Sequence, residues 1–106
     1  MQTLLIVDDE PNIVEGLASQ FEALEDDPPL VVFRAFSGTH ALSILRNNRV
    51  DVVLSDIKMP DLSGLQLIRE AERLWPKCRF IFLTGHNDLP EQIDDVRAEI
   101  VEYAPA

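Results

Sequence analysis

The chain has 106 residues, of which 46% are hydrophobic, and this favours one compact domain with a single core over a disordered segment. Nine Lys and Arg residues against nineteen Asp and Glu residues give a formal net charge of −10, which opposes binding to nucleic acid or to an anionic membrane. One cysteine allows no internal disulfide, and no apolar run is long enough for a membrane span or a signal peptide, so we expect a cytoplasmic protein.

Short apolar runs alternate with longer stretches of helical spacing, which is typical of βα units. In chain order we expect a strand at 3–7, a helix at 11–25, a strand at 30–36 and a helix from the Ser37 cap to about 48. A strand at 50–55 follows, and then a helix that begins after the Ser63 cap and ends before Pro76. The last elements are a strand at 79–84, a weak helix at 88–99 and a fifth strand at 100–103. This order predicts an α/β fold with a parallel sheet.

Carboxylates and a hydroxyl stand at the expected carboxyl ends of three strands. They are Asp8 and Asp9 after the first, Asp56 after the third and Thr84 on the fourth. Ligands of open parallel α/β sheets bind at these ends. Two like charges about 4 Å apart repel by roughly 4 kcal/mol at an effective dielectric constant near 20, so such a group needs a cation or shifted pKa values. The pattern predicts Mg²⁺ binding and, at Asp56, nucleophilic attack on phosphorus to form an acyl phosphate.

Each of these residues also has an ordinary structural explanation. An acidic residue just before Pro11 is a common helix start. Asp56 after a strand is typical of turns, and threonine is a common strand residue. Only the joint placement at three strand ends favours the chemical interpretation.

Three motifs resemble those of the receiver domain of two-component response regulators (CheY-like). They are Val-Asp-Asp-Glu-Pro at 7–11, Leu-Ser-Asp-Ile-Lys-Met-Pro at 54–60 with Ser-Gly-Leu at 63–65, and Phe-Leu-Thr-Gly at 82–85. The middle motif is highly specific. The resemblance implies a flavodoxin-like, doubly wound parallel sheet of the (βα)5 receiver type, formed by residues 1–106 as one domain and cut short after the fifth strand.

The resemblance also implies a role for each matching residue. Asp56 corresponds to the phosphoacceptor and Thr84 to the hydroxyl that turns inward to hydrogen-bond the phosphoryl group. Asp9 and Asp56 would bind Mg²⁺ directly, and Asp8 would bind it mainly through a water. The backbone carbonyl of Lys58 would be a further ligand.

The family's lysine at the end of the fifth strand has no counterpart, because the chain's only lysines are Lys58 and Lys77. Either Ala104 replaces it, with Tyr103 as the aromatic switch residue, or the chain is cut or altered before the true strand end. Its absence removes one positive charge that would pair with the phosphoryl group. Loss of the fifth helix would expose apolar sheet surface, which suggests a partner or a homodimer.

The leading hypothesis is a phosphoacceptor module rather than an enzyme. It takes a phosphoryl group from a sensor histidine kinase or a phosphotransfer protein, and it switches an output domain or a downstream protein outside this chain. A degenerate receiver that acts through constitutive contacts is the second hypothesis. A Mg²⁺-dependent phosphatase ranks last, because Lys58 stands where the large aspartate-nucleophile phosphatase group has its second aspartate.

Two residues near the fourth strand, Trp75 and Cys78, are expected to have structural rather than chemical roles. Trp75 is expected to pack at a helix end. Cys78 lies between Lys77 and Arg79, two cations that would lower the pKa of an exposed thiol, but we expect it to be inert.

Overall fold

The computed structural model describes residues 2–23, 30–56, 59 and 61–82. These residues form four strands and three helices in strict alternation: β1 (Gln2–Val7), α1 (Pro11–Glu22), β2 (Leu30–Ala35), α2 (Gly38–Asn47), β3 (Val52–Ser55), α3 (Gly64–Leu74) and β4 (Arg79–Phe82). The expected helix at 88–99 and the fifth strand at 100–103 lie outside the described residues.

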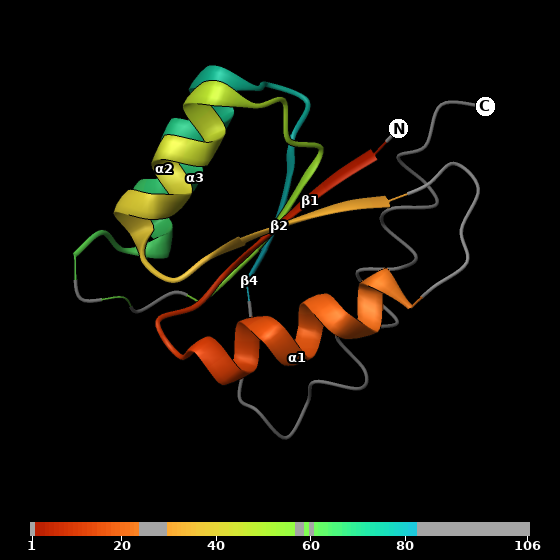
Figure 1. Ribbon diagram of the computed structural model, residues 1–106. Helices are drawn as coiled ribbons and strands as arrows, with labels where there is room; N and C mark the ends of the chain where they lie inside the picture. Colours follow the sequence, from red (N-terminus) through yellow and green to blue (C-terminus); the bar gives the residue numbers. More distant parts are fainter. Residues whose placement is uncertain (1, 24–29, 57–58, 60, 83–106) are drawn as a thin grey trace.

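The four strands form one parallel sheet in the order β2-β1-β3-β4. Helix α1 covers one face of this sheet, and α2 and α3 lie side by side on the other (Figure 1). From β1 the chain first adds β2 on one side, and it then crosses back past β1 to add β3 and β4 on the other side. Because of this reversal, the connecting helices lie on both faces of the sheet. The predicted doubly wound parallel α/β fold is confirmed for this part of the chain.

The two central strands are buried on both faces, so their sequences are continuous apolar runs rather than alternating ones. On one side, Leu4, Ile6, Val52 and Leu54 pack against the buried face of α1, which consists of Val14, Leu17, Ala18 and Phe21. On the other side, Leu5, Val7 and Val53 pack against Ala41 and Leu45 of α2 and Leu67 and Ala71 of α3. The buried residues of α1 recur at steps of three and four positions, so they form one apolar face.

The helices on the second face begin at local polar caps. Ser37 is the N-cap of α2, and its Oγ accepts a hydrogen bond from the backbone N–H of His40 at 3.0 Å. Ser63 and Gln66 form a reciprocal capping box at the start of α3. Both serine caps are confirmed.

The structure corrects some details of the prediction. Strand β3 begins at Val52 rather than at residue 50, and β2 ends at Ala35 rather than at residue 36. Leu65, in the first turn of α3, is 57% exposed. Within the described residues, none of the helices has the length and apolar character that a bilayer span requires.

The Asp51 side chain stabilises the beginning of the β1–β3 pair through hydrogen bonds. Its carboxylate, nearly buried at 8% exposure, accepts hydrogen bonds from the backbone N–H of Thr3 at 2.9 Å and from the Thr3 hydroxyl at 3.2 Å. The Nε of Arg49 lies 3.5 Å from the same carboxylate, but the Arg49 side chain is largely exposed.

We expect Asp51→Ala to lower the free energy of unfolding by about 1–3 kcal/mol, because it leaves the Thr3 N–H without its acceptor in a partly buried position. The matched Arg49→Ala change removes only an exposed ion pair and should cost less than about 1 kcal/mol. Urea unfolding of both variants measures the difference. Equal losses would contradict this account.

Candidate metal centre

The register of β1 and β3 places two aspartates side by side. Val7 and Ser55 are paired across the two strands, and Asp8 and Asp56 each come directly afterwards. The backbone N–H of Asp56 donates to the Val7 carbonyl at 3.0 Å, so the pairing continues to the position of the carboxylates. The backbone N–H of Asp8 donates to Ala35 of β2 at 3.3 Å. The carboxyl edge of the sheet therefore holds both residues through backbone bonds.

Asp9 completes a group of three carboxylates. One oxygen from each of Asp8, Asp9 and Asp56 lies within 4.8 Å of the others. Asp8 is buried, Asp56 is half-buried and Asp9 is exposed, so the group opens to solvent on the side of Asp9. An all-oxygen set of this charge suits a hard divalent cation such as Mg²⁺, which keeps several waters.

The surroundings of Asp8 disfavour a negative charge. Burial is the main cause that raises the pKa of Asp8 to about 6, with further contributions from a hydrogen bond with Asp9 and from the charges of Asp56 and Asp9. The backbone N–H of Glu10 donates to Oδ1 of Asp8 at 3.0 Å and acts in the opposite direction. A bound cation would remove this repulsion, and so the donor set fits a divalent metal ion.

The helix-start explanation does not account for these acidic side chains. Glu10 is the N-cap residue of α1, yet its side chain makes no capping hydrogen bond, and Pro11 occupies the first turn. The Asp8 carboxylate accepts a hydrogen bond from Glu10, which precedes the helix. The N-terminus of α1 nevertheless lies next to the carboxylates and contributes a favourable partial positive charge.

Three of the predicted site residues are thus brought together by the described part of the chain. Lys58 and Thr84 lie outside the described residues, although Phe82, which precedes Thr84 by two positions, pairs with Ser55. Asp61, which no sequence motif marks as a site residue, contacts the start of α2. An aspartate in a loop-like motif was the only signal, and its partners lie 22 and 23 positions earlier.

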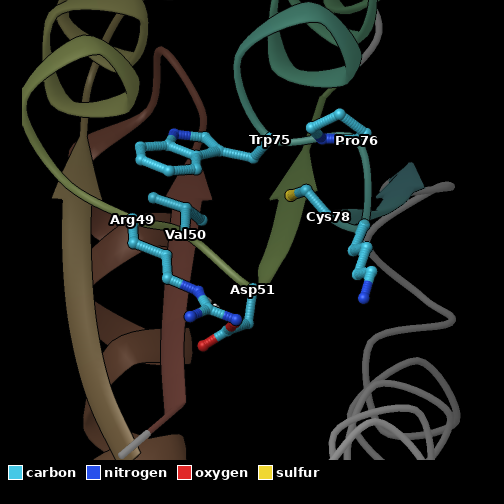
Figure 2. Close-up of a pocket in the computed structure, with 7 residues that line it drawn as sticks. Arg49, Val50, Asp51, Trp75, Pro76 and Cys78 are labelled. Carbon is cyan, nitrogen blue, oxygen red and sulfur yellow. Dashed lines mark ion pairs between the residues drawn. The ribbon is translucent and has the colours of Figure 1, made fainter.

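A pocket of about 270 Å³ lies at the opposite end of the sheet, before β3. Figure 2 shows the Cys78 sulfur directed into it, while the Arg49 guanidinium lies against Asp51. The indole N–H of Trp75 donates to the Leu45 carbonyl at 2.8 Å, which agrees with its predicted packing role. Burial, with the charge of Asp51, raises the pKa of the Cys78 thiol to about 12, so the adjacent cations do not activate it.

Comparison with known proteins decides the family. A family model described as the response regulator receiver domain matches residues 4–104. The chain belongs to this family. The receiver domain is 34% identical over 92 residues to the transcriptional regulatory protein GlrR of Escherichia coli K12, which covers 85% of this chain and 19% of that protein. It is also 34% identical over 86 residues to the sensor kinase CckA of Brucella abortus, covering 79% of this chain and 9% of that protein.

Solved structures agree with the fold. The crystal structure of a two component transcriptional regulator AraC from Clostridium phytofermentans superimposes with a TM-score of 0.78 at 27% identity, covering 97% of this chain and 94% of that chain. The receiver domain spans less than half of the length of the curated relatives named above. As a member of this family it is a regulatory domain of two-component signalling.

The raised pKa of Asp8 has a consequence for stability. A carboxyl group whose pKa is higher in the folded than in the unfolded state destabilises the fold when ionised, and this cost disappears as the pH falls through about 6 toward 4. In metal-free buffer at pH 7.5 we expect Asp8→Asn to raise the free energy of unfolding by about 1–3 kcal/mol. The difference from the parent should shrink toward pH 4.5. Urea unfolding across this range measures it, and a difference that does not change with pH would refute the assignment.

The thiol of Cys78 should be unreactive in the folded protein. At pH 8 we expect iodoacetamide to alkylate it roughly a hundredfold or more slowly than in the urea-unfolded chain, because the attacking thiolate is scarce at this pKa. Intact-mass measurement over time follows the reaction. Native alkylation at the unfolded rate would show that the thiol is neither buried nor shifted.

Proposed function

We propose that this receiver domain is a phosphoacceptor, in which Asp56 takes a phosphoryl group in a Mg²⁺-dependent reaction. The observation that carries the proposal is the meeting of Asp8, Asp9 and Asp56 at the carboxyl edge of the sheet, with oxygens within 4.8 Å of one another. Membership of the receiver family supports the same reaction.

Burial distinguishes the three carboxylates. Asp56 is half-buried at the end of the central strand β3, where solvent reaches it and its backbone is held by β1. By the resemblance to receiver domains, Asp9, which is exposed, is proposed as a direct ligand, and Asp8, which is buried, as a ligand mainly through a water. The backbone carbonyl of Lys58 is proposed as a further ligand. Bound Mg²⁺ would neutralise the carboxylates and the incoming phosphoryl oxygens.

The chemistry assigned to Asp56 is a nucleophilic displacement. One carboxylate oxygen forms a bond to phosphorus as the bond from phosphorus to the donor's histidine nitrogen breaks, and that nitrogen keeps the electron pair. The product is an acyl phosphate. The Thr84 hydroxyl is proposed to donate a hydrogen bond to a phosphoryl oxygen.

The lysine content of the chain supports a second candidate. Lys58 and Lys77 are the only lysines, and neither occupies the end of the expected fifth strand, where Ala104 is the candidate replacement. If Ala104 replaces that lysine, the phosphoryl group has one positive charge fewer beside it, and phosphorylation and conformational switching would be less tightly coupled. A receiver that acts through constitutive contacts is therefore the alternative.

We propose a cytoplasmic setting with two kinds of partner. A sensor histidine kinase or a phosphotransfer protein supplies the phosphoryl group, and an output domain or a downstream protein responds to it. The relatives support this assignment, since one is named a transcriptional regulatory protein and another a sensor kinase, and the receiver domain corresponds to a small part of each.

Incubation with Mg²⁺ and acetyl phosphate or phosphoramidate should add one phosphoryl group to the protein, detected by intact-mass measurement. Asp56→Asn should abolish the gain, because its amide is not a nucleophile toward phosphorus. Omission of Mg²⁺ or addition of a chelator should have the same effect.

The outcomes separate the candidates. A gain that Asp56→Asn does not remove would place the acceptor elsewhere. A folded protein that binds Mg²⁺ but gains no phosphoryl group would favour the constitutive interaction module. Continuous hydrolysis of an added phosphate ester would instead identify a phosphatase.

A further inference from the structure

The pocket at the amino end of the sheet lies between two connecting segments. One segment joins α2 to β3, and the other joins α3 to β4. The pocket has a volume of about 270 Å³, and it is separate from the three carboxylates, which follow β1 and β3 at the opposite end of the sheet. All the residues that line it belong to the described part of the chain.

The inner walls of this pocket are apolar. Val50 is almost completely buried, and the indole of Trp75 and the ring of Pro76 line the same space. Figure 2 shows the Cys78 sulfur directed into the pocket. This sulfur belongs to a neutral thiol, because burial, with the charge of Asp51, raises its pKa to about 12. Such walls favour an apolar ligand, and the indole favours an aromatic ring that can pack against it.

Hydrogen bonds hold both connecting segments in place. The indole N–H of Trp75 donates to the Leu45 carbonyl at 2.8 Å, and the backbone N–H of Cys78 donates to the Trp75 carbonyl at 2.8 Å. The two segments are joined where the backbone N–H of Arg79 donates to the Asp51 carbonyl at 2.9 Å. A ligand that enters the pocket therefore finds its walls already ordered, which lowers the entropic cost of binding.

The charged residues of the pocket favour an anion. Arg49 and Lys77 line it together with one carboxylate, that of Asp51, so the lining is positive although the whole chain has a formal charge of −10. Both oxygens of Asp51 are engaged, one by Thr3 and the other by Nε of Arg49 at 3.5 Å. The Arg49 side chain is 75% exposed, so its guanidinium can turn toward an anionic ligand. A cationic ligand would instead have to displace these partners of Asp51.

The volume of the pocket limits the size of its ligand. A dry apolar cavity of about 150 Å³ holds benzene. Pockets for drug-sized ligands occupy roughly 300 to 1,000 Å³. At about 270 Å³ the pocket has room for one aromatic ring with a short substituent.

We propose that this pocket binds a small aromatic carboxylate, with its ring against Trp75 and its carboxylate paired with Arg49 at the rim. The inference does not rest on the proposed phosphoacceptor function, because the two sites lie at opposite ends of the sheet and share no residue. A ligand bound here would contact the segments before β3 and before β4 and would thereby stabilise the folded state.

The test uses phenylacetate as the probe and phenylacetamide as its uncharged counterpart. Trp75 is the only tryptophan of the chain, so its fluorescence and the NMR signal of its indole N–H report directly on the pocket. We expect both probes to change these signals saturably. Phenylacetate should bind roughly twofold to fivefold more tightly than the amide, which is the range for a solvent-exposed ion pair.

Two substitutions separate the ionic contact from the apolar one. Arg49→Gln should remove the preference for phenylacetate and leave the affinity for phenylacetamide unchanged. The matched control is Arg46→Gln, which removes an exposed arginine from the last turn of α2 that does not line the pocket, and it should keep the preference. Cys78→Met places a larger side chain in the space into which the sulfur points, so it should abolish the binding of both probes.

Urea unfolding of each variant establishes that it is folded. Because Arg49 is largely exposed, Arg49→Gln tests the proposal even if Cys78→Met does not fold. Three results would overturn the assignment: no saturable change in the Trp75 signals of the folded parent chain, equal affinities of the parent chain for the two probes, or a preference that Arg46→Gln removes as fully as Arg49→Gln. A folded Cys78→Met variant that binds both probes like the parent would also overturn it. The phosphorylation of Asp56 is measured separately by intact mass, so none of these results alters the proposed function.

Discussion

The parallel pairing of β1 with β3 is the constraint on which the site depends. The pairing aligns Val7 with Ser55, and the backbone bond from Asp56 to Val7 extends it by one residue. As a result, Asp8 and Asp56 emerge from adjacent strands at the same edge, although 48 positions separate them in the chain. A shift of one residue in this register would turn the buried side chains of β3 to the wrong faces of the sheet, so the packing of the core and the geometry of the carboxylates are set together.

The group of three carboxylates at the edge of the sheet lowers the stability of the folded state. Carboxylates held within 4.8 Å of one another, one of them buried, disfavour the folded state whenever all are ionised. The apolar cores on the two faces of the sheet offset this cost, because strands β1 and β3 are almost completely buried between α1 on one side and α2 and α3 on the other. A cation bound at the site would convert the repulsion into a favourable interaction and would thereby stabilise the folded state.

The two faces of the molecule contribute differently to the carboxyl edge. Helix α1 begins at Pro11, two positions after Asp9, so its N-terminus contributes a favourable partial positive charge near these carboxylates. On the other face, the Asp61 carboxylate accepts hydrogen bonds from the backbone N–H groups of Gly38 and Thr39 at the start of α2. Strand β3 is thus packed against helices on both faces of the sheet.

Much of the architecture follows from local patterns in the sequence. The apolar runs of β1 and β3, the helical spacing of α1 and the serine caps of α2 and α3 are short-range features, and they predicted these elements. The positions of Asp8, Asp9 and Asp56 directly after strands predicted that the three carboxylates meet at one edge of the sheet. Element ends were less well predicted, as with β3, which begins at Val52. The order of the strands and their register, the raised pKa of Asp8 and the contact of Asp61 with α2 depend on residues far apart in the chain. Only the tertiary structure decides these, because burial and hydrogen bonding between distant segments exist only once the sheet has formed.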